Sequence, residues 1–155
     1  MPQFGIVAGC GSLGHGLPMA VGLAYALTLQ KKPGRVFVLV GDGECQEGST
    51  WEAAQFASQH QLANLTLIVD ENQLQAMDFT ERIIYQDLSQ LFLDFGWHEA
   101  WCMDGDNFSD LKKKLSRHAL FNPQVLVVVT TKGAGMPCAE NKAHFHYRLP
   151  SCAEL

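Results

Sequence analysis

Two polar turns in this sequence carry oxygen groups that could bind a divalent cation. The segment VLVGDGECQEGS places Asp42 between two glycines after an apolar run, and VDENQL places Asn72 and Leu74 after the next run. Mg²⁺ prefers hard oxygen ligands: a carboxylate, an amide oxygen, backbone carbonyls and phosphate oxygens. The glycines beside Asp42 let the main chain approach a phosphate closely. These residues predict a site for Mg²⁺ and a diphosphate.

Two glycine-rich loops could take part in the same chemistry. Residues 9–16 (GCGSLGHG) open a helical pattern, and residues 132–135 (KGAG) follow a run of valines. Amides in a glycine loop or at a helix start carry partial positive charge, which favours phosphate groups. The simpler alternatives are an ordinary acidic turn at Asp42 and a loop at 9–16 that only begins a helix.

The elements that must position these loops alternate between strand and helix. Strand patterns fall at residues 35–40, 65–69, 96–103 and 124–131, and helical patterns at 16–30, 49–59, 87–95 and 108–120. Near-continuous apolar, β-branched runs are typical of strands buried on both faces of a parallel sheet. We therefore expect a doubly wound α/β fold with a mostly parallel sheet and helices on both faces. Ligands of such folds bind beyond the carboxyl ends of the strands, where these loops fall.

Polar residues mark the expected helix ends. Ser49 and Glu52 have the spacing of a capping box, and Asn107 is a candidate cap for the helix at 108–120. Asn122 and Pro123 would stop that last helix.

Composition limits the classes of protein that this chain can belong to. Its 155 residues suit one domain, here residues 1–155, with 47% hydrophobic residues and a net charge of −5. We expect no nucleic-acid partner, because basic residues cluster only at 112–114, and no membrane span. Five cysteines without a C-x-x-C pair favour reduced thiols and a cytoplasmic location.

The ordered motifs of the chain resemble the transketolases. The segments GSLGHGL, VGDGECQEGSTWEAAQFA, VDENQLQ, FGWH, TTKGAG and ENKAHFHYRLP occur in transketolase order over nearly the whole chain. The spacing of Gly41-Asp42-Gly43 from Asn72 is similar to the thiamine diphosphate-binding motif of that family. The pattern is most similar to the N-terminal subunit of bacterial transketolases that are split into two chains.

This resemblance implies a cofactor and its ligands. Asp42 and Asn72 would bind Mg²⁺ through their side chains, Leu74 would bind it through its carbonyl, and the Gly43 amide would contact the diphosphate. Asn72 thereby also belongs to the cofactor site. The cofactor would further be lined by three loop residues: Gly11, Ser12 and Leu13.

The resemblance also implies roles nearer to the substrate. Lys132 and His146 match positions beside the diphosphate and the sugar phosphate, and Glu47 matches an acid that joins paired active sites across an oligomer interface. We thus expect His146 and Glu47 to take part in catalysis. In the simpler interpretation His146 is a surface histidine, and Glu44 and Glu47 are acids favoured by a helix dipole.

Compared with a complete transketolase, the chain begins almost at the glycine loop, so we expect a domain that is incomplete on its N-terminal side. Two-carbon ketol transfer between sugar phosphates, as in the pentose phosphate pathway, would require a partner chain. We expect that partner to be a C-terminal transketolase subunit carrying the pyrimidine-binding domain, in a homo- or hetero-oligomer. Two alternatives remain: another thiamine diphosphate enzyme (deoxyxylulose-phosphate synthase or a 2-oxoacid dehydrogenase component), or a truncated subunit without turnover.

Overall fold

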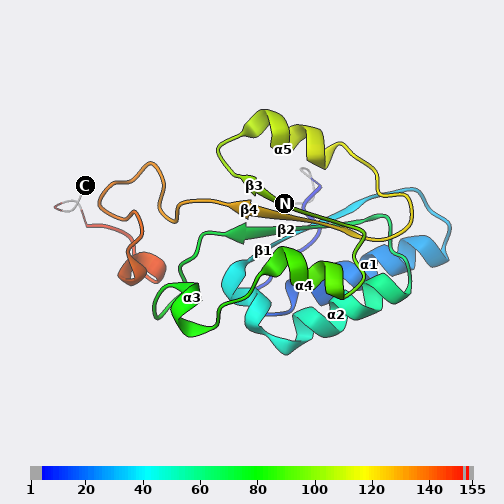
Figure 1. Ribbon diagram of the computed structural model, residues 1–155, viewed down its shortest axis with the longest axis horizontal. Coiled ribbons are helices and arrows are strands. Elements are labelled where there is room, and N and C mark those ends of the chain that lie inside the picture. The colour runs from blue at the N-terminus through cyan, green and yellow to red at the C-terminus, as the bar shows by residue number, and fades with distance from the viewer. Residues whose placement is uncertain (1–4, 152, 154–155) are drawn as a thin grey trace.

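The computed structural model describes residues 5–151 and 153, apart from the side chains of residues 99–102. It forms an α/β layered domain in which helices cover both faces of one sheet (Figure 1). In chain order the elements are α1 (Gly16–Leu29), β1 (Val36–Gly41), η2 (Asp42–Gln46), α2 (Gly48–Gln59), β2 (Leu65–Glu71), α3 (Thr80–Ile83), α4 (Leu88–Asp94), β3 (Glu99–Asp104), α5 (Phe108–Leu115), β4 (Gln124–Val129) and η3 (Ala143–His146).

The sheet has four strands in the order β1-β2-β4-β3, and all three neighbouring pairs are parallel. The chain passes from β1 through α2 to β2, continues through α4 to the far edge at β3, and returns through α5 to β4. Because the return reverses direction, right-handed crossovers place α5 on the opposite face from α2 and α4 (Figure 1). The predicted doubly wound fold is confirmed.

The two faces of the sheet are covered unequally. The larger core lies against α1, α2 and α4, and it takes Leu65, Leu67 and Val69 from β2, all fully buried. A smaller core lies under α5 and consists of Met103, Leu126 and Val128 with the half-buried Ile68, Leu111 and Leu115. On this second face of the edge strand β1, Phe37 and Leu39 are exposed.

Two details of the helices differ from the prediction. Helix α5 ends at Leu115 instead of residue 120, where the Arg35 guanidinium donates to the Leu115 carbonyl at 2.8 Å, and Leu120 beyond it is exposed. Ser49 does not cap α2. It lies inside that helix, and its hydroxyl donates to the Gly14 carbonyl at 2.7 Å.

Other expectations from the sequence can be compared directly. The Asn107 cap is confirmed, since its side chain accepts from the Asp110 amide. Cys10, Cys45 and Cys138 are free thiols, whereas the side chain of Cys102 and all of Cys152 lie outside the described residues. Across the described part of the chain, no helix has the length and apolar character that a membrane crossing requires.

Candidate metal and diphosphate site

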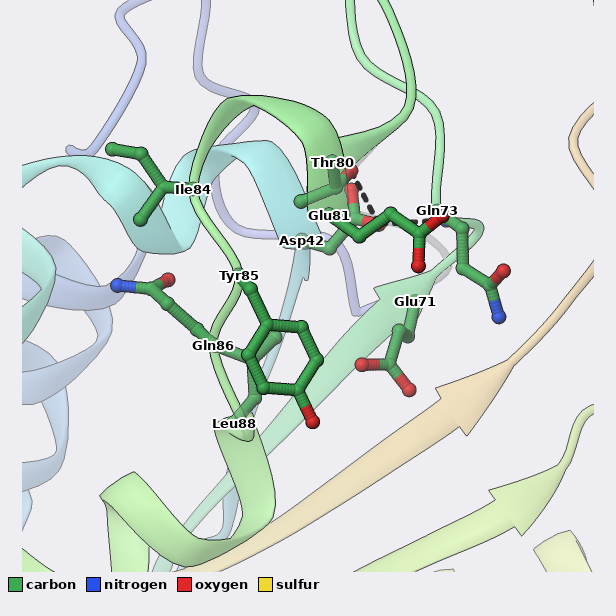
Figure 2. Close-up of a pocket in the computed structure, with 9 residues that line it drawn as sticks. All are labelled: Asp42, Glu71, Gln73, Thr80, Glu81, Ile84, Tyr85, Gln86 and Leu88. Carbon is green, nitrogen blue, oxygen red and sulfur yellow. Dashed lines mark hydrogen bonds between the residues drawn. The ribbon is translucent and has the colours of Figure 1, made fainter.

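Asp42 is a buried carboxylate at the point where β1 ends and η2 begins. Its side chain is only 3% exposed, because the three-residue period of the 3₁₀ turn places it on the same side as the fully buried Cys45. The Oδ1 atom accepts from the Gly43 amide at 2.7 Å. The Oδ2 atom accepts from the Gln73 amide at 2.7 Å and from the Thr80 hydroxyl at 3.2 Å (Figure 2). Three donors thus fix the carboxylate beside the chain that follows β2.

Asn72 is oriented by a short series of hydrogen bonds across the ends of β2 and β4. The Thr130 hydroxyl donates to Oδ1 of Asp70, and the Asn72 amide nitrogen donates to Oδ2 of Asp70 at 3.1 Å. Oδ1 of Asn72 in turn accepts from the Leu74 amide at 3.2 Å. The acceptor on Asp70 therefore determines which way the carboxamide of Asn72 faces, and it turns the oxygen toward Leu74.

Leu74 presents its backbone to this site while its side chain is buried. The side chain is 2% exposed, and the residue forms an antiparallel bridge with Phe79. The Leu74 carbonyl takes no part in the hydrogen bonds of that bridge, and no amide in the described part of the chain donates to it. The carbonyl oxygen thus has a free lone pair that could bind a cation.

The electrostatics around Asp42 favour a cation. Burial raises the pKa of Asp42, and the charge of Asp70 raises it further, against the lowering effect of its three hydrogen bonds. Burial also raises the pKa of Glu71, with added repulsion from Asp42 and Asp87. In the described residues no positive side chain offsets these effects on the two carboxyls. A divalent cation would relieve this excess of negative charge.

The residues present fit Mg²⁺ and a diphosphate. A carboxylate has about four lone-pair positions, and three donors occupy those of Asp42, so one remains for a metal. Asn72 and Leu74 add an amide oxygen and a carbonyl oxygen, which are the hard donors that Mg²⁺ prefers. A Cβ atom built on Gly11 or Gly41 would meet nothing within 4 Å, so both backbones are open to a ligand. The Gly43 amide, in contrast, is already engaged by Asp42.

A cavity of about 180 Å³ lies next to Asp42, between the end of β2 and the segment that leads into α4 (Figure 2). Its walls combine acidic groups with apolar ones and a tyrosine ring: Asp42, Glu71, Gln73, Thr80, Glu81, Ile84, Tyr85, Gln86 and Leu88. Asp42 and Glu71 thus face one shared cavity.

The predicted loop residues lie at the surface before α1. The Ser12 hydroxyl pairs with Nδ1 of His15 at 3.0 Å, and the Leu13 side chain is 60% exposed. An exposed leucine in this place is available to pack on the ring of a ligand. The loop contacts the segment that follows β1 through Gly14, so it belongs to the same edge of the molecule as Asp42.

Lys132 and His146 form a second group, on the C-terminal segment beyond the carboxyl ends of the strands (Figure 1). Burial lowers the pKa of His146, and the charge of Lys132 lowers it further. No described contact joins either residue to Asp42. Glu47, the N-cap residue of α2, is exposed. The roles expected of these three residues stay predictions.

Sequence reasoning missed four residues that organise the site: Glu44, Asp70, Thr80 and Thr130. Asp70 and Thr130 could have been found from the register of a parallel sheet, in which Asp70 pairs with Val128 and the strand ends lie level. Thr80 and Glu44 gave no such signal, because their partners are 38 and 28–30 residues away in the sequence.

Comparison with known proteins gives one consistent family. Residues 2–149 match the family model described as transketolase, thiamine diphosphate binding domain. The chain is 40% identical over 152 residues to an apulose-4-phosphate transketolase subunit from Actinobacillus succinogenes, covering 97% of this chain and 55% of that protein. It is also 40% identical over 138 residues to human transketolase, covering 88% of this chain and 22% of the human protein.

Solved structures agree with the sequence comparison. The crystal structure of transketolase from Campylobacter jejuni superposes with a TM-score of 0.78 at 28% identity, over 88% of this chain and 23% of that one. The chain spans about half the length of the Actinobacillus protein and less than a quarter of the full-length transketolases.

Proposed function

Because the chain belongs to the family of transketolase thiamine diphosphate-binding domains, we propose that it binds the diphosphate of this cofactor through Mg²⁺. The observation that carries the proposal is the grouping of Asp42, Asn72 and the unpaired Leu74 carbonyl beside two carboxyl groups that no positive side chain of the described residues offsets. In this proposal Asp42, Asn72 and Leu74 hold the metal. The open backbone at Gly11 and Gly41 faces the diphosphate, and Leu13 packs on the cofactor rings.

The reaction that we propose is transfer of a two-carbon ketol unit from a ketose phosphate to an aldose phosphate. When bound, thiamine diphosphate supplies the nucleophilic carbon for this chemistry, so the protein's task is to orient the cofactor and the sugar. Asp70 would keep the Asn72 oxygen turned toward the metal, which reduces the reorganisation needed on binding. Lys132 and His146 would approach the phosphate or hydroxyl groups of the sugar from the C-terminal segment.

Activity would require a second chain in this proposal. Similar proteins are named as single subunits of transketolases, and such a name implies that another subunit completes the enzyme. We propose a partner that carries the pyrimidine-binding domain of transketolase and completes the cofactor site, with Glu47 at the shared interface. Relatives act, by their names, on apulose 4-phosphate and on 6-deoxy-6-sulfo-D-fructose, so the substrate class proposed here is a ketose with an anionic end group.

Calorimetric titration tests the proposal at its first step. Thiamine diphosphate with Mg²⁺ is titrated into the wild-type chain, alone and with a transketolase C-terminal subunit. The same titration is repeated with Asp42→Asn, with Asn72→Ala, and with Glu52→Gln as a control at an exposed position on α2. We expect saturable binding that needs Mg²⁺, is lost in the first two variants and survives in the control. Binding that does not depend on Mg²⁺, or that survives Asp42→Asn, would contradict the metal role.

A further inference from the structure

The glycine loop (residues 9–16) is attached to the acidic turn (residues 41–44) by one side chain, Glu44. Its Oε1 atom accepts from the Gly14 amide at 3.1 Å and from the Gly16 amide at 3.3 Å. These groups lie 28–30 residues apart in sequence, so the contact is tertiary. Through this contact one carboxylate joins the two segments expected to surround the diphosphate.

Helix α1 depends on this carboxylate for its N-terminus. The first amides of a helix have no partner inside the helix, and the N-cap residue of α1, His15, makes no side-chain capping bond. The first turn of α1 contains no acidic residue either. Glu44 therefore supplies from outside the negative charge that favours a helix N-terminus, and charge-assisted bonds of this kind are about twice as strong as neutral ones.

Glu44 itself is held on a rigid base. Its carbonyl accepts from the fully buried Thr50 hydroxyl at 3.0 Å and from the Glu47 amide at 3.1 Å. Its neighbour Cys45 is also fully buried. The Ser49 hydroxyl completes the attachment by donating to the Gly14 carbonyl at 2.7 Å. The backbone at Gly14 is thus held through both its N–H and its C=O.

The contact is so close that Gly14 has no room for a side chain and Gly16 has little. A Cβ atom on Gly14 would lie 2.6 Å from Cβ of Glu47 and 2.6 Å from Oγ of Ser49, and one on Gly16 would lie 3.2 Å from Oε1 of Glu44. A Cβ on Gly11 would meet nothing within 4 Å. The four glycines of the loop therefore divide into two that face the protein, Gly14 and Gly16, and two that are open, Gly9 and Gly11.

We propose that Glu44 is a positioning residue, which fixes the glycine loop relative to the acidic turn and so sets the affinity for thiamine diphosphate. This inference rests on the proposed function for the identity of the ligand. Glu44 would not contact the cofactor. It would act through Gly14 and Gly16, by keeping residues 11–13 in the position in which they can contact the diphosphate and the rings of the cofactor.

The test compares Glu44→Gln, Glu44→Ala and Ser49→Ala with the matched control Glu52→Gln, which changes an exposed glutamate on α2. Two properties are measured on the full chain with its partner subunit: amide hydrogen exchange at Gly14 and Gly16, and the dissociation constant for thiamine diphosphate with Mg²⁺. Glu44→Gln keeps the shape and one acceptor oxygen, so it stays interpretable if Glu44→Ala fails to fold.

We expect Glu44→Gln to speed exchange at both amides and to weaken cofactor binding about tenfold, with larger effects in Glu44→Ala and none in Glu52→Gln. A residue that only filled space would leave Glu44→Gln like the wild type. Unchanged exchange in the Glu44 variants, or faster exchange with unchanged affinity, would overturn the inference and leave the proposed function standing. If the wild type binds no cofactor, the proposed function fails together with the affinity part of the inference, and exchange alone still decides whether Glu44 holds the loop.

Discussion

Replacing Gly14 by alanine should destabilise the protein by about 3 kcal/mol, a large effect for one methyl group. Gly14 has a φ of +78°, and an L-residue in this left-handed region costs about 1–2 kcal/mol. The new Cβ would also overlap the Glu47 Cβ, which cannot rotate away because it is fixed to the backbone at the start of α2. Relieving the overlap would break the Ser49 bond to the Gly14 carbonyl, worth roughly 1 kcal/mol.

Thermal unfolding measures this effect directly. For a chain of 155 residues, about 3 kcal/mol corresponds to a fall in Tm of roughly 10 °C. Gly11→Ala is the matched control, because it adds the same methyl group to the same loop, where nothing lies within 4 Å. We expect its Tm to stay within about 2 °C of the wild type. Equal Tm values for the two variants would refute the claim that Gly14 is enclosed and Gly11 open.

Three further outcomes follow from other contacts. Trp97→Phe should lower the free energy of unfolding in urea by about 2 kcal/mol, because Trp97 is 2% exposed and its indole N–H donates to the Ala54 carbonyl at 3.0 Å. An unchanged urea midpoint would mean that this hydrogen bond contributes nothing to stability. Iodoacetamide at pH 8 should label the exposed Cys10 in the folded protein and leave Cys45 unlabelled until the protein unfolds, because burial raises the pKa of the Cys45 thiol. Peptide mass spectrometry measures the labelling of each cysteine, and labelling of Cys45 in the folded protein would contradict its burial. Lys132→Gln should raise the pKa of His146 in an NMR titration but leave it below the ordinary value for histidine, because burial is the larger cause of the lowering and remains in the variant. An unchanged pKa of His146 would mean that Lys132 lies too far from the ring to affect it.

The strands, and the turns that carry the candidate site residues, could be predicted from the sequence because their signals are local. The run Leu65–Val69 identifies a buried strand by composition alone, whereas the equally apolar Val36–Val40 forms an edge strand whose Phe37 and Leu39 are exposed. A carboxylate between glycines at a strand end predicts a ligand turn. Asp42 lies beside the segment that carries Asn72 and Leu74, because its carboxylate accepts from the Gln73 amide between them, and the metal role of these three residues stays a prediction. The two turns lie side by side because they follow neighbouring parallel strands, β1 and β2, whose carboxyl ends meet at the same edge of the sheet.

What the sequence could not reveal depends on contacts between distant residues. The end of α5 is bonded to Arg35, eighty residues from Leu115. The role of Ser49 was misjudged because a serine near a helix start predicts a cap, whereas the glycine loop offered its hydroxyl a tertiary acceptor. Glu44 looked like an ordinary first-turn acid for the same reason. Periodicity and spacing report on the residue's own element and carry no information about such partners.

The unequal covering of the two sheet faces has a consequence for aggregation. Only the small core under α5 protects Leu126 and Val128, so α5 can open locally at a lower free energy than the face covered by three helices. The strand register places Leu39, Ile68 and Leu126 in one row across the sheet. Opening of α5 would therefore join the exposed side chains of β1 to newly exposed ones in one apolar strip ending at a strand edge. Self-association would begin from this partly opened native state, well before global unfolding.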